Sequence, residues 1–207
     1  MAKPPAGKAS KAKAPDTRED PLDAAAGLFR KQGFAATTVR QIARRAGMLP
    51  GSLHYRFPSK EALLLALMER AIERSMAAVR EAVAGQTDPL ERVRLGLRAH
   101  LRLLVSGGDD SVYVLLYDWR SLEGEARRQM LVLRERYETF WDVLMADAKQ
   151  AGLVREGVDP VLVRLLGFGA VNWVAQWYEP GGPWTPEQIA DAVWSYFGFG
   201  VLASEPA

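Results

Sequence analysis

The 207-residue sequence contains no cysteine, which excludes disulfide scaffolds, cysteine zinc sites and thiol nucleophiles. Only two histidines occur, His54 and His100, so we do not expect a metal site built from several histidines. No apolar run approaches the roughly 20 residues of a membrane span. The first residues also lack the apolar stretch of a signal peptide. We therefore expect a cytoplasmic protein with no metal, no other cofactor and no membrane partner.

Signals for β-structure are equally scarce. Val, Ile and Thr never gather into alternating runs, and no Asn-Gly or Asp-Gly hairpin turn occurs. Proline, glycine and capping residues instead divide the chain into about nine helical segments, which predicts an all-α fold. These helices are expected to begin near Asp20, Thr38, Pro50, Lys60, Asp88, Ser111, Glu125, Asp159 and Thr185.

Charge is unevenly distributed, although the formal net charge is only +2. Residues 1–76 carry 14 basic and 7 acidic side chains, against 13 and 18 in the remainder. A basic N-terminal third on a mildly acidic body suggests a polyanion-binding module joined to a different kind of domain. We divide the chain into a disordered basic tail (1–18), a helix-turn-helix domain (19–59), a linking helix (60–84) and a body (85–207).

The helix-turn-helix prediction rests on the segment from Thr37 to Glu61. Two short helices are expected there, joined by a tight turn at Gly47, where glycine adopts a left-handed backbone at little cost. In this arrangement the second helix enters the major groove of DNA. The apolar side chains that would fix the two helices against each other are Val39, Ile42, Ala43, Leu53 and Phe57.

This region strongly resembles the TetR family of bacterial transcriptional regulators. The resemblance covers about residues 16–76, and the matching pieces are Ala25–Phe29, Gly33-Phe34, Thr37–Ala43, Ala46-Gly47, Gly51–Leu53, Phe57 and Lys60–Leu63. Two positions depart from the family pattern. Leu49 stands where a small polar cap is usual, and His54 stands where a tyrosine commonly contacts the DNA backbone.

The resemblance implies which residues contact DNA. Gly51 and Ser52 would approach base edges at the start of the recognition helix, and Tyr55 and Arg56 would reach bases or phosphates. Phosphate contacts are implied for Thr38, Arg40, His54 and Lys60, the last at a helix N-terminus, where anions are favoured. The alternative for each is a solvated surface side chain.

The body is aromatic-rich and predicts a ligand pocket. All six tryptophans lie after Met76. His100 and Asn172 each fall on the apolar stripe of an expected helix, and apolar pockets with a few placed polar groups are typical of small-molecule sites. A structural hydrogen bond is the alternative for either residue. The candidate ligand-binding residues are His100, Tyr117, Arg120, Tyr137, Trp141, Asn172 and Trp173.

The body also resembles, less closely, TetR regulators that respond to acyl-CoA thioesters in fatty-acid, steroid or aromatic-acid breakdown. The runs that carry this resemblance are Tyr117–Leu122, Arg134…Tyr137…Trp141 and Asn172–Gly182. They imply an apolar pocket whose rim could meet a CoA phosphate, unless the arginines form a solvated helix face. The rim residues would be Arg120, Arg127, Arg128 and Arg134.

The family resemblance further implies a homodimer through the last two helices, bound to double-stranded DNA at a palindromic operator. The final helix is apolar nearly all round, which favours burial against a partner. We therefore predict a ligand-responsive repressor, with activation left open. The alternatives are a non-CoA lipophilic or drug effector controlling efflux, and a ligand-independent architectural DNA binder. An enzyme is disfavoured because no catalytic cysteine, metal cluster or paired His–carboxylate motif is present.

Overall fold

The computed structural model describes residues 19–105 and 110–201, which form nine α-helices and one short 3-10 helix. The predicted all-α fold is therefore confirmed. The predicted basic tail (1–18) lies outside the described residues. The elements are α1 (Pro21–Ala36), α2 (Val39–Arg45), α3 (Pro50–Arg56), α4 (Lys60–Val83), α5 (Pro89–Val105), α6 (Ser111–Asp118), η1 (Trp119–Ser121), α7 (Gly124–Gln150), α8 (Pro160–Trp177) and α9 (Pro186–Val201).

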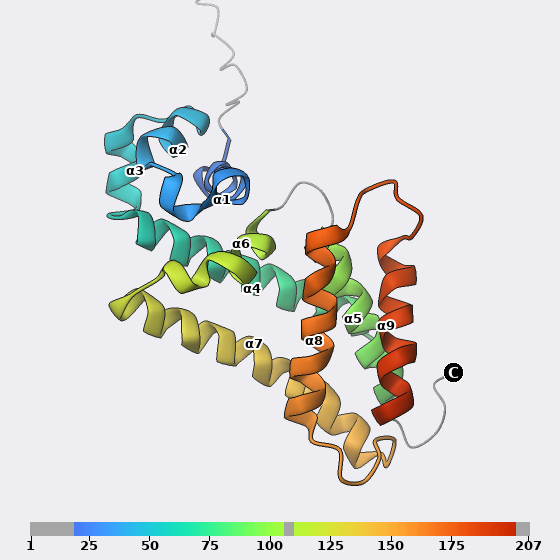
Figure 1. Cartoon of the computed structure of the whole chain (residues 1–207). Coiled ribbons are helices and arrows are strands. Elements are labelled where there is room, and N and C mark those ends of the chain that lie inside the picture. Colours follow the sequence, from blue (N-terminus) through green and yellow to red (C-terminus); the bar gives the residue numbers. More distant parts are fainter. Residues whose placement is uncertain (1–18, 106–109, 202–207) are drawn as a thin grey trace, which may run out of the picture.

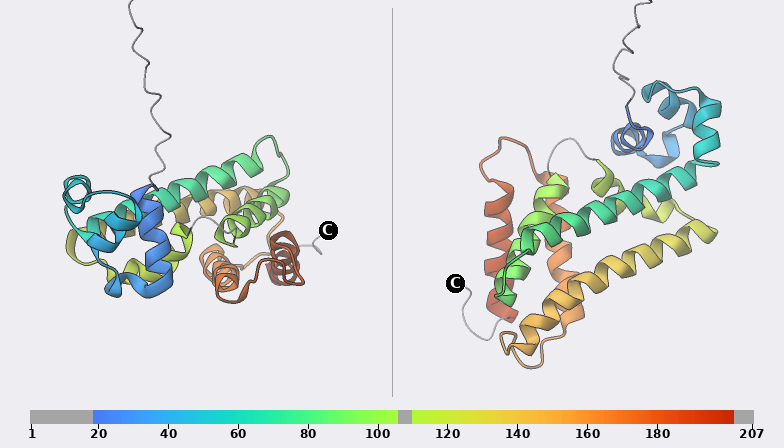
Figure 2. Two further views of the ribbon diagram at one scale, coloured as in Figure 1. Left: turned by 90° about the horizontal axis from the view of Figure 1, so that it is seen from above. Right: turned by 180° about the vertical axis from the view of Figure 1, so that it is seen from behind.

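The helices are arranged in two parts that α4 connects (Figure 1). Helices α1 to α3 gather at one end, and α4 leads from them into the body. Helices α5, α6 and α7 all pack against α4, and α5 also stands with α8 and α9 at the far end (Figure 2). Within the described residues, no helix combines the length and the apolar character needed to cross a membrane.

The predicted capping signals explain where most helices begin. Side-chain oxygens accept hydrogen bonds from first-turn N–H groups at Asp20, Thr38, Ser59, Asp159 and Thr185. Leu49 supplies no such oxygen, so α3 begins at Pro50, whose ring fixes φ near the helical value. Gly33 interrupts α1 rather than ending it as expected: its φ of 81° leaves the helix, and a last short turn follows to Ala36.

One apolar cluster joins the two parts of the molecule. Ile42, Ala43 and Leu53 are fully buried, as the helix-turn-helix pattern predicts. The same cluster continues through α4 to Val114 on α6 and Met130 on α7. The head formed by α1 to α3 therefore packs on α6 as well as on α4. A movement of α6 would change the position of the head.

Candidate functional site

The recognition helix α3 presents a polar, solvent-facing surface. The turn before it contains Gly47 at φ 64°, and Leu53 anchors the helix by pointing into the core. Tyr55 is 93% exposed and is the most prominent side chain of this surface. The structure thus brings together on one exposed face the residues predicted to contact DNA along α3, which are Gly51, Ser52, His54, Tyr55 and Arg56.

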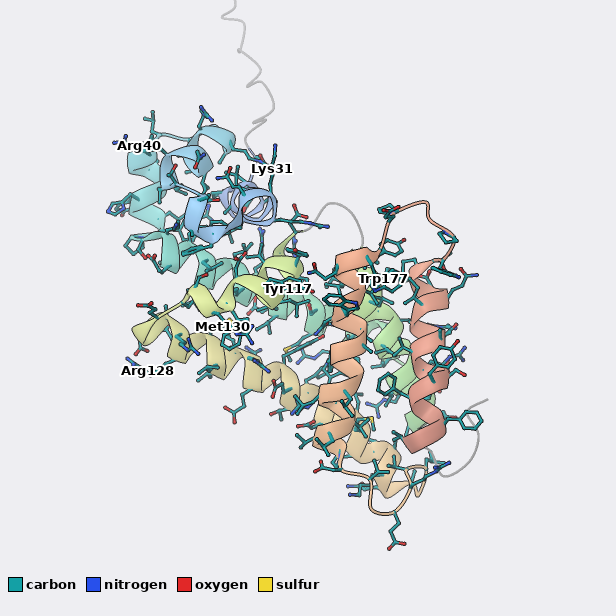
Figure 3. All side chains as sticks on the ribbon, viewed as in Figure 1. Lys31, Arg40, Tyr117, Arg128, Met130 and Trp177 are labelled. Atoms are coloured by element: carbon teal, nitrogen blue, oxygen red, sulfur yellow. The ribbon has the colours of Figure 1, made fainter. Side chains whose placement is uncertain are left out.

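Arg40 extends this surface from α2. It is exposed, and Figure 3 shows it at the outer edge of the head. The Thr38 hydroxyl, in contrast, is engaged in the capping box with Gln41, which donates its backbone N–H and accepts at its side-chain oxygen. Its first role is therefore structural.

Lys60, which is predicted to contact a phosphate, is engaged within the head in the DNA-free protein. Its ammonium group donates to the carbonyl oxygens of Phe34 at 2.7 Å and Thr37 at 3.0 Å, and it lies 4.1 Å from the centre of the Phe34 ring. The carbonyls at the end of α1 have spare acceptor capacity and attract a cation. Lys60 thus ties the start of α4 to the end of α1.

The body encloses a cavity of about 300 Å³ between α4, α5, α6, α7 and α8. Its wall is mostly apolar, and five of the predicted ligand-binding residues lie in it. These are His100, Arg120, Tyr137, Trp141 and Asn172. Helix α6 closes the side nearest the head with Val112, Leu115 and Leu116.

A hydrogen-bonded chain of polar side chains lies in this wall. The Nδ1 atom of His100 is 2.7 Å from the Tyr137 hydroxyl, and its Nε2 atom is 3.1 Å from Oδ1 of Asn172. Because that amide oxygen can only accept, Nε2 carries the proton and Nδ1 accepts from Tyr137. Burial lowers the pKa of His100 to about 4, so the imidazole is neutral at pH 7. Burial also raises the pKa of the Tyr137 hydroxyl.

This polar chain leaves hydrogen-bond donors available to a ligand. With Oδ1 of Asn172 already accepting from His100, its amide nitrogen is the atom with hydrogens to give. The buried indole N–H of Trp141 makes no hydrogen bond of normal geometry among the described residues, although its proximity to the Tyr137 hydroxyl offsets part of the rise that burial causes in the pKa of that group. A ligand oxygen with lone pairs, such as a carbonyl, would satisfy both groups.

Arginines surround the indole of Trp119, which lines the cavity together with Arg120 and Arg134, while Arg127 lies beside this indole outside the lining. The guanidinium carbons of Arg120, Arg127 and Arg134 lie 4.7, 5.4 and 5.5 Å from the centre of the Trp119 ring. Arg134 is paired with Glu138 at 2.7 Å. Within the described part of the chain, neither Arg120 nor Arg127 has a carboxylate partner. The mouth of the cavity therefore carries uncompensated positive charge.

The ion pair of Arg134 and Glu138 continues to a further arginine on α8. Arg164 of α8, whose side chain is 9% exposed, contacts Glu138 at 3.0 Å and Asp142 at 2.8 Å on α7. These contacts hold α8 against α7 beside the cavity. No three His, Asp or Glu side chains of the described residues are grouped as metal ligands.

Three predicted site residues lie elsewhere. Trp173 is 64% exposed on the outer face of α8, because it directly follows the inward-facing Asn172. Tyr117 stands outside the cavity wall and donates to the carbonyl oxygen of Asn172 at 3.2 Å. Arg128 is paired with Glu125 at the outer end of α7 and points away from the cavity (Figure 3).

Sequence reasoning also missed several wall residues. Trp119, Arg164 and Phe168 were not among the predictions, and each contributes a ring or a charge to the site. Phe168 stands four residues before Asn172, one helical turn away, so the helical spacing of α8 would have found it. The position of Trp119 depends on the 3-10 turn after α6, which the sequence pattern did not reveal.

Two family models match the chain. The model for "Bacterial regulatory proteins, tetR family" matches residues 22–67, and that for "Tetracyclin repressor-like, C-terminal domain" matches residues 86–201. Among curated proteins, the chain is similar to the HTH-type transcriptional repressor KstR2 of Mycobacterium tuberculosis. The two are 30% identical over 174 residues, which cover 83% of this chain and 86% of the relative.

Solved structures agree with this assignment. The structure of AibR in complex with isovaleryl coenzyme A and operator DNA is 30% identical, with a TM-score of 0.75, and the match covers 84% of this chain and 94% of AibR. FadR from Bacillus subtilis in complex with stearoyl-CoA shares the fold at 22% identity, with a TM-score of 0.75. The match covers 87% of this chain and 97% of FadR. The chain therefore belongs to the TetR family and is a DNA-binding transcriptional repressor rather than an enzyme.

Proposed function

We propose that this repressor is released from its operator by an acyl-CoA thioester. The observation that carries the proposal is the combination of an apolar cavity with unpaired arginines at its mouth. An acyl chain would fill the cavity, while Arg120 and Arg127 would meet the phosphates of CoA, since arginine binds phosphate with paired N–H donors. The relatives bound to isovaleryl-CoA and stearoyl-CoA support the same effector class.

The carbonyl of the thioester fits the donors on the wall. An amide nitrogen and an indole N–H are offered where the apolar lining is interrupted by Asn172 and Trp141. A thioester oxygen accepts hydrogen bonds and carries no charge, so it can enter this buried site without the cost of desolvating an ion. A free carboxylate would have to give up its hydration beside the uncharged His100.

On the DNA side, α3 would lie in the major groove, with Gly51 and Ser52 close to base edges. Tyr55 and Arg56 would reach bases or flanking phosphates from the exposed face of the helix. His54 and Arg40 are proposed to contact phosphates. Thr38 and Lys60 support the head from within, through the contacts described above.

The dimer is proposed to form through α8 and α9, which lie side by side on the outer face of the body (Figure 1). Large apolar side chains are exposed along both helices, and Tyr196 alone is 79% exposed. Apolar patches of this kind mark association surfaces. The residues concerned are Leu162, Leu166, Trp173, Trp177, Tyr196 and Phe199. A two-fold axis there would present two recognition helices to a palindrome.

Helix α6 provides the route from effector to DNA. Its inner face lines the cavity through Val112 and Leu116. At its start, Asp110 accepts a hydrogen bond at 2.7 Å from Arg30 of α1, and the Arg30 guanidinium carbon lies 4.9 Å from the centre of the Tyr113 ring. A ligand that displaces α6 would therefore move the head, and it favours release to the extent that it binds the displaced state more tightly.

The test is release of operator DNA by a panel of acyl-CoA thioesters, the matching free acids and CoA alone. We expect thioesters to release DNA. Arg120→Gln should raise the thioester concentration needed for half-maximal release at least tenfold. Arg128→Gln is the matched control, because Arg128 is already paired with Glu125 outside the site. If free acids or unrelated lipophilic compounds release DNA and no thioester does, the effector is not a CoA ester.

A further inference from the structure

The body contains a second, smaller space behind the effector cavity. It has a volume of about 90 Å³ and lies between α5, α7, α8 and α9. Its wall is formed by aliphatic and aromatic side chains, including Leu97, Val163, Val193 and Phe197. The one charged wall residue is Arg164, whose guanidinium is held by carboxylates of α7, so that it offers its aliphatic stem. We call this space the rear chamber.

The rear chamber and the effector cavity share a wall. Trp141, Arg164 and Phe168 line both. The rings of Trp141 and Phe168 meet edge to face with centroids 5.1 Å apart, and Phe168 also lies edge-on to His100 at 5.0 Å. The aromatic pair therefore separates the polar chain of the effector cavity from an apolar space directly behind it.

The two rings of this partition differ in how firmly they are held. Trp141 is 4% exposed, and its six-membered ring packs so closely on α5 that a Cβ at Gly96 would lie 3.1 Å from it. Phe168 is only half-buried and stands between Gly167 and Gly169. No atom lies within 4 Å of where a Cβ would stand at either glycine. Because Phe168 is less buried than Trp141, it is the less firmly held ring of the pair.

We propose that the far end of the acyl group passes Phe168 and ends in the rear chamber, so that Phe168 determines the length of acyl chain to which the repressor responds. This inference rests on the proposed function, because it assigns the second half of the same ligand. The chamber is too small and too apolar for a nucleotide, whereas a hydrocarbon terminus needs no polar partner. Each methylene buried there would tighten binding about fourfold, at ~0.8 kcal/mol per methylene.

Two glycines of α8 provide a matched pair of variants. Gly167 lines the rear chamber only, and Gly169 lines the effector cavity only. At both positions a Cβ would meet no neighbouring atom and φ is not positive, so a side chain can be introduced without backbone strain. Gly167→Leu would fill the rear chamber, and Gly169→Leu would narrow the effector cavity.

The experiment measures dissociation constants of the full-length protein for butanoyl-, octanoyl- and hexadecanoyl-CoA by tryptophan fluorescence. In the unaltered protein the two longer thioesters should bind at least tenfold more tightly than butanoyl-CoA. Gly167→Leu should reduce that preference at least tenfold, whereas Gly169→Leu should weaken all three thioesters together. Phe168→Ala, which removes the partition, should shift the preference toward the longest chain.

Sedimentation of each variant identifies any change in oligomeric state. If Gly167→Leu changes the oligomeric state, Phe168→Ala becomes the variant that tests whether the tail enters the rear chamber. If thioesters bind but neither Gly167→Leu nor Phe168→Ala changes the chain-length preference by more than twofold, the rear chamber does not hold the tail. If no thioester binds at all, the proposed function itself fails, and this assignment fails with it.

Discussion

The head and the body of this protein bury their apolar residues in different ways. In the head, Phe29, Ile42 and Leu53 are almost completely buried, and neither cavity reaches α1, α2 or α3. The body leaves spaces of about 300 and 90 Å³ among its helices and exposes large apolar side chains on α8 and α9. A filled core holds one geometry, whereas unfilled space and an uncovered face leave free energy to be gained by binding. The head is therefore suited to presenting a fixed surface, and the body to responding.

The contacts between the two parts combine a continuous apolar core with polar pairs at its edge. Arg70 of α4 contacts Asp20 at 3.1 Å and Asp23 at 2.5 Å on α1, and Arg30 of α1 contacts Asp110 at 2.7 Å next to α6. Exposed ion pairs contribute little to stability but fix orientation. The joint can therefore be reset by a modest displacement of α6 while the head stays folded.

The largest expected effect compares matched truncations in the two parts. Leu53→Ala removes a fully buried side chain from the filled head and should lower the free energy of unfolding by about 2–5 kcal/mol. Leu116→Ala, in the wall of an existing cavity, should cost about 1 kcal/mol because fewer contacts are lost. Urea denaturation at one fixed protein concentration measures both. Equal costs would mean that the cavity is filled in the free protein.

The second prediction concerns pH and the polar chain in the body. His100 has a folded-state pKa of about 4, below the ordinary value of 6.5. Between pH 4 and pH 6.5 this histidine is therefore protonated in the unfolded chain and neutral in the folded chain. Stability should therefore be intact above pH 6.5 and fall as pH drops toward 4, by about 3 kcal/mol in total. His100→Gln should flatten this dependence in urea denaturation across pH 4–7. His54→Gln, in the head, is the control and should retain the slope of the unaltered protein.

The sequence predicted the head more completely than the body. Caps at Asp20 and Thr38, the glycine turn at Gly47 and the buried Leu53 are local signals, so helix spacing alone determines their places. The exception is Lys60. The sequence shows a cation at a helix N-terminus, but it does not show that the carbonyls ending α1 fold back to within hydrogen-bond distance.

In the body, the sequence predicted the inward-facing polar residues but not their surroundings. His100 and Asn172 were found because they interrupt apolar stripes, and the structure brings them together across two helices. Trp173 was misplaced because a neighbour one residue along a helix points about 100° away. The stacking of arginines on Trp119 depends on the crossing of η1 and α7, which is a tertiary feature without a local signal.

The third prediction weakens the joint between the two parts. Arg30→Ala removes the contacts to Asp110 and Tyr113 without touching the cavity or the recognition helix. Operator affinity without effector should change less than threefold. The factor by which the effector lowers operator affinity should become about fivefold smaller, because about 1 kcal/mol of coupling free energy is lost. Lys31→Ala, on the exposed neighbouring position, is the control. Operator titrations with and without thioester measure both quantities, and an unaltered effector response would exclude this joint as the route.

The smallest expected effect separates cations that meet DNA from those that hold the head together. Arg40→Ala should reduce the slope of log operator affinity against log salt concentration by about 0.9 per subunit, since each phosphate contact releases counterions. Lys60→Met keeps the aliphatic stem and removes the ammonium that caps α1, so the salt slope should remain while the free energy of unfolding falls by about 1 kcal/mol. Operator titrations between 50 and 200 mM salt and urea denaturation of the same preparations give the two readings. A salt slope that falls for Lys60→Met as much as for Arg40→Ala would show that Lys60 leaves the α1 carbonyls for a phosphate when DNA binds, and would restore the role that its position in the sequence predicts.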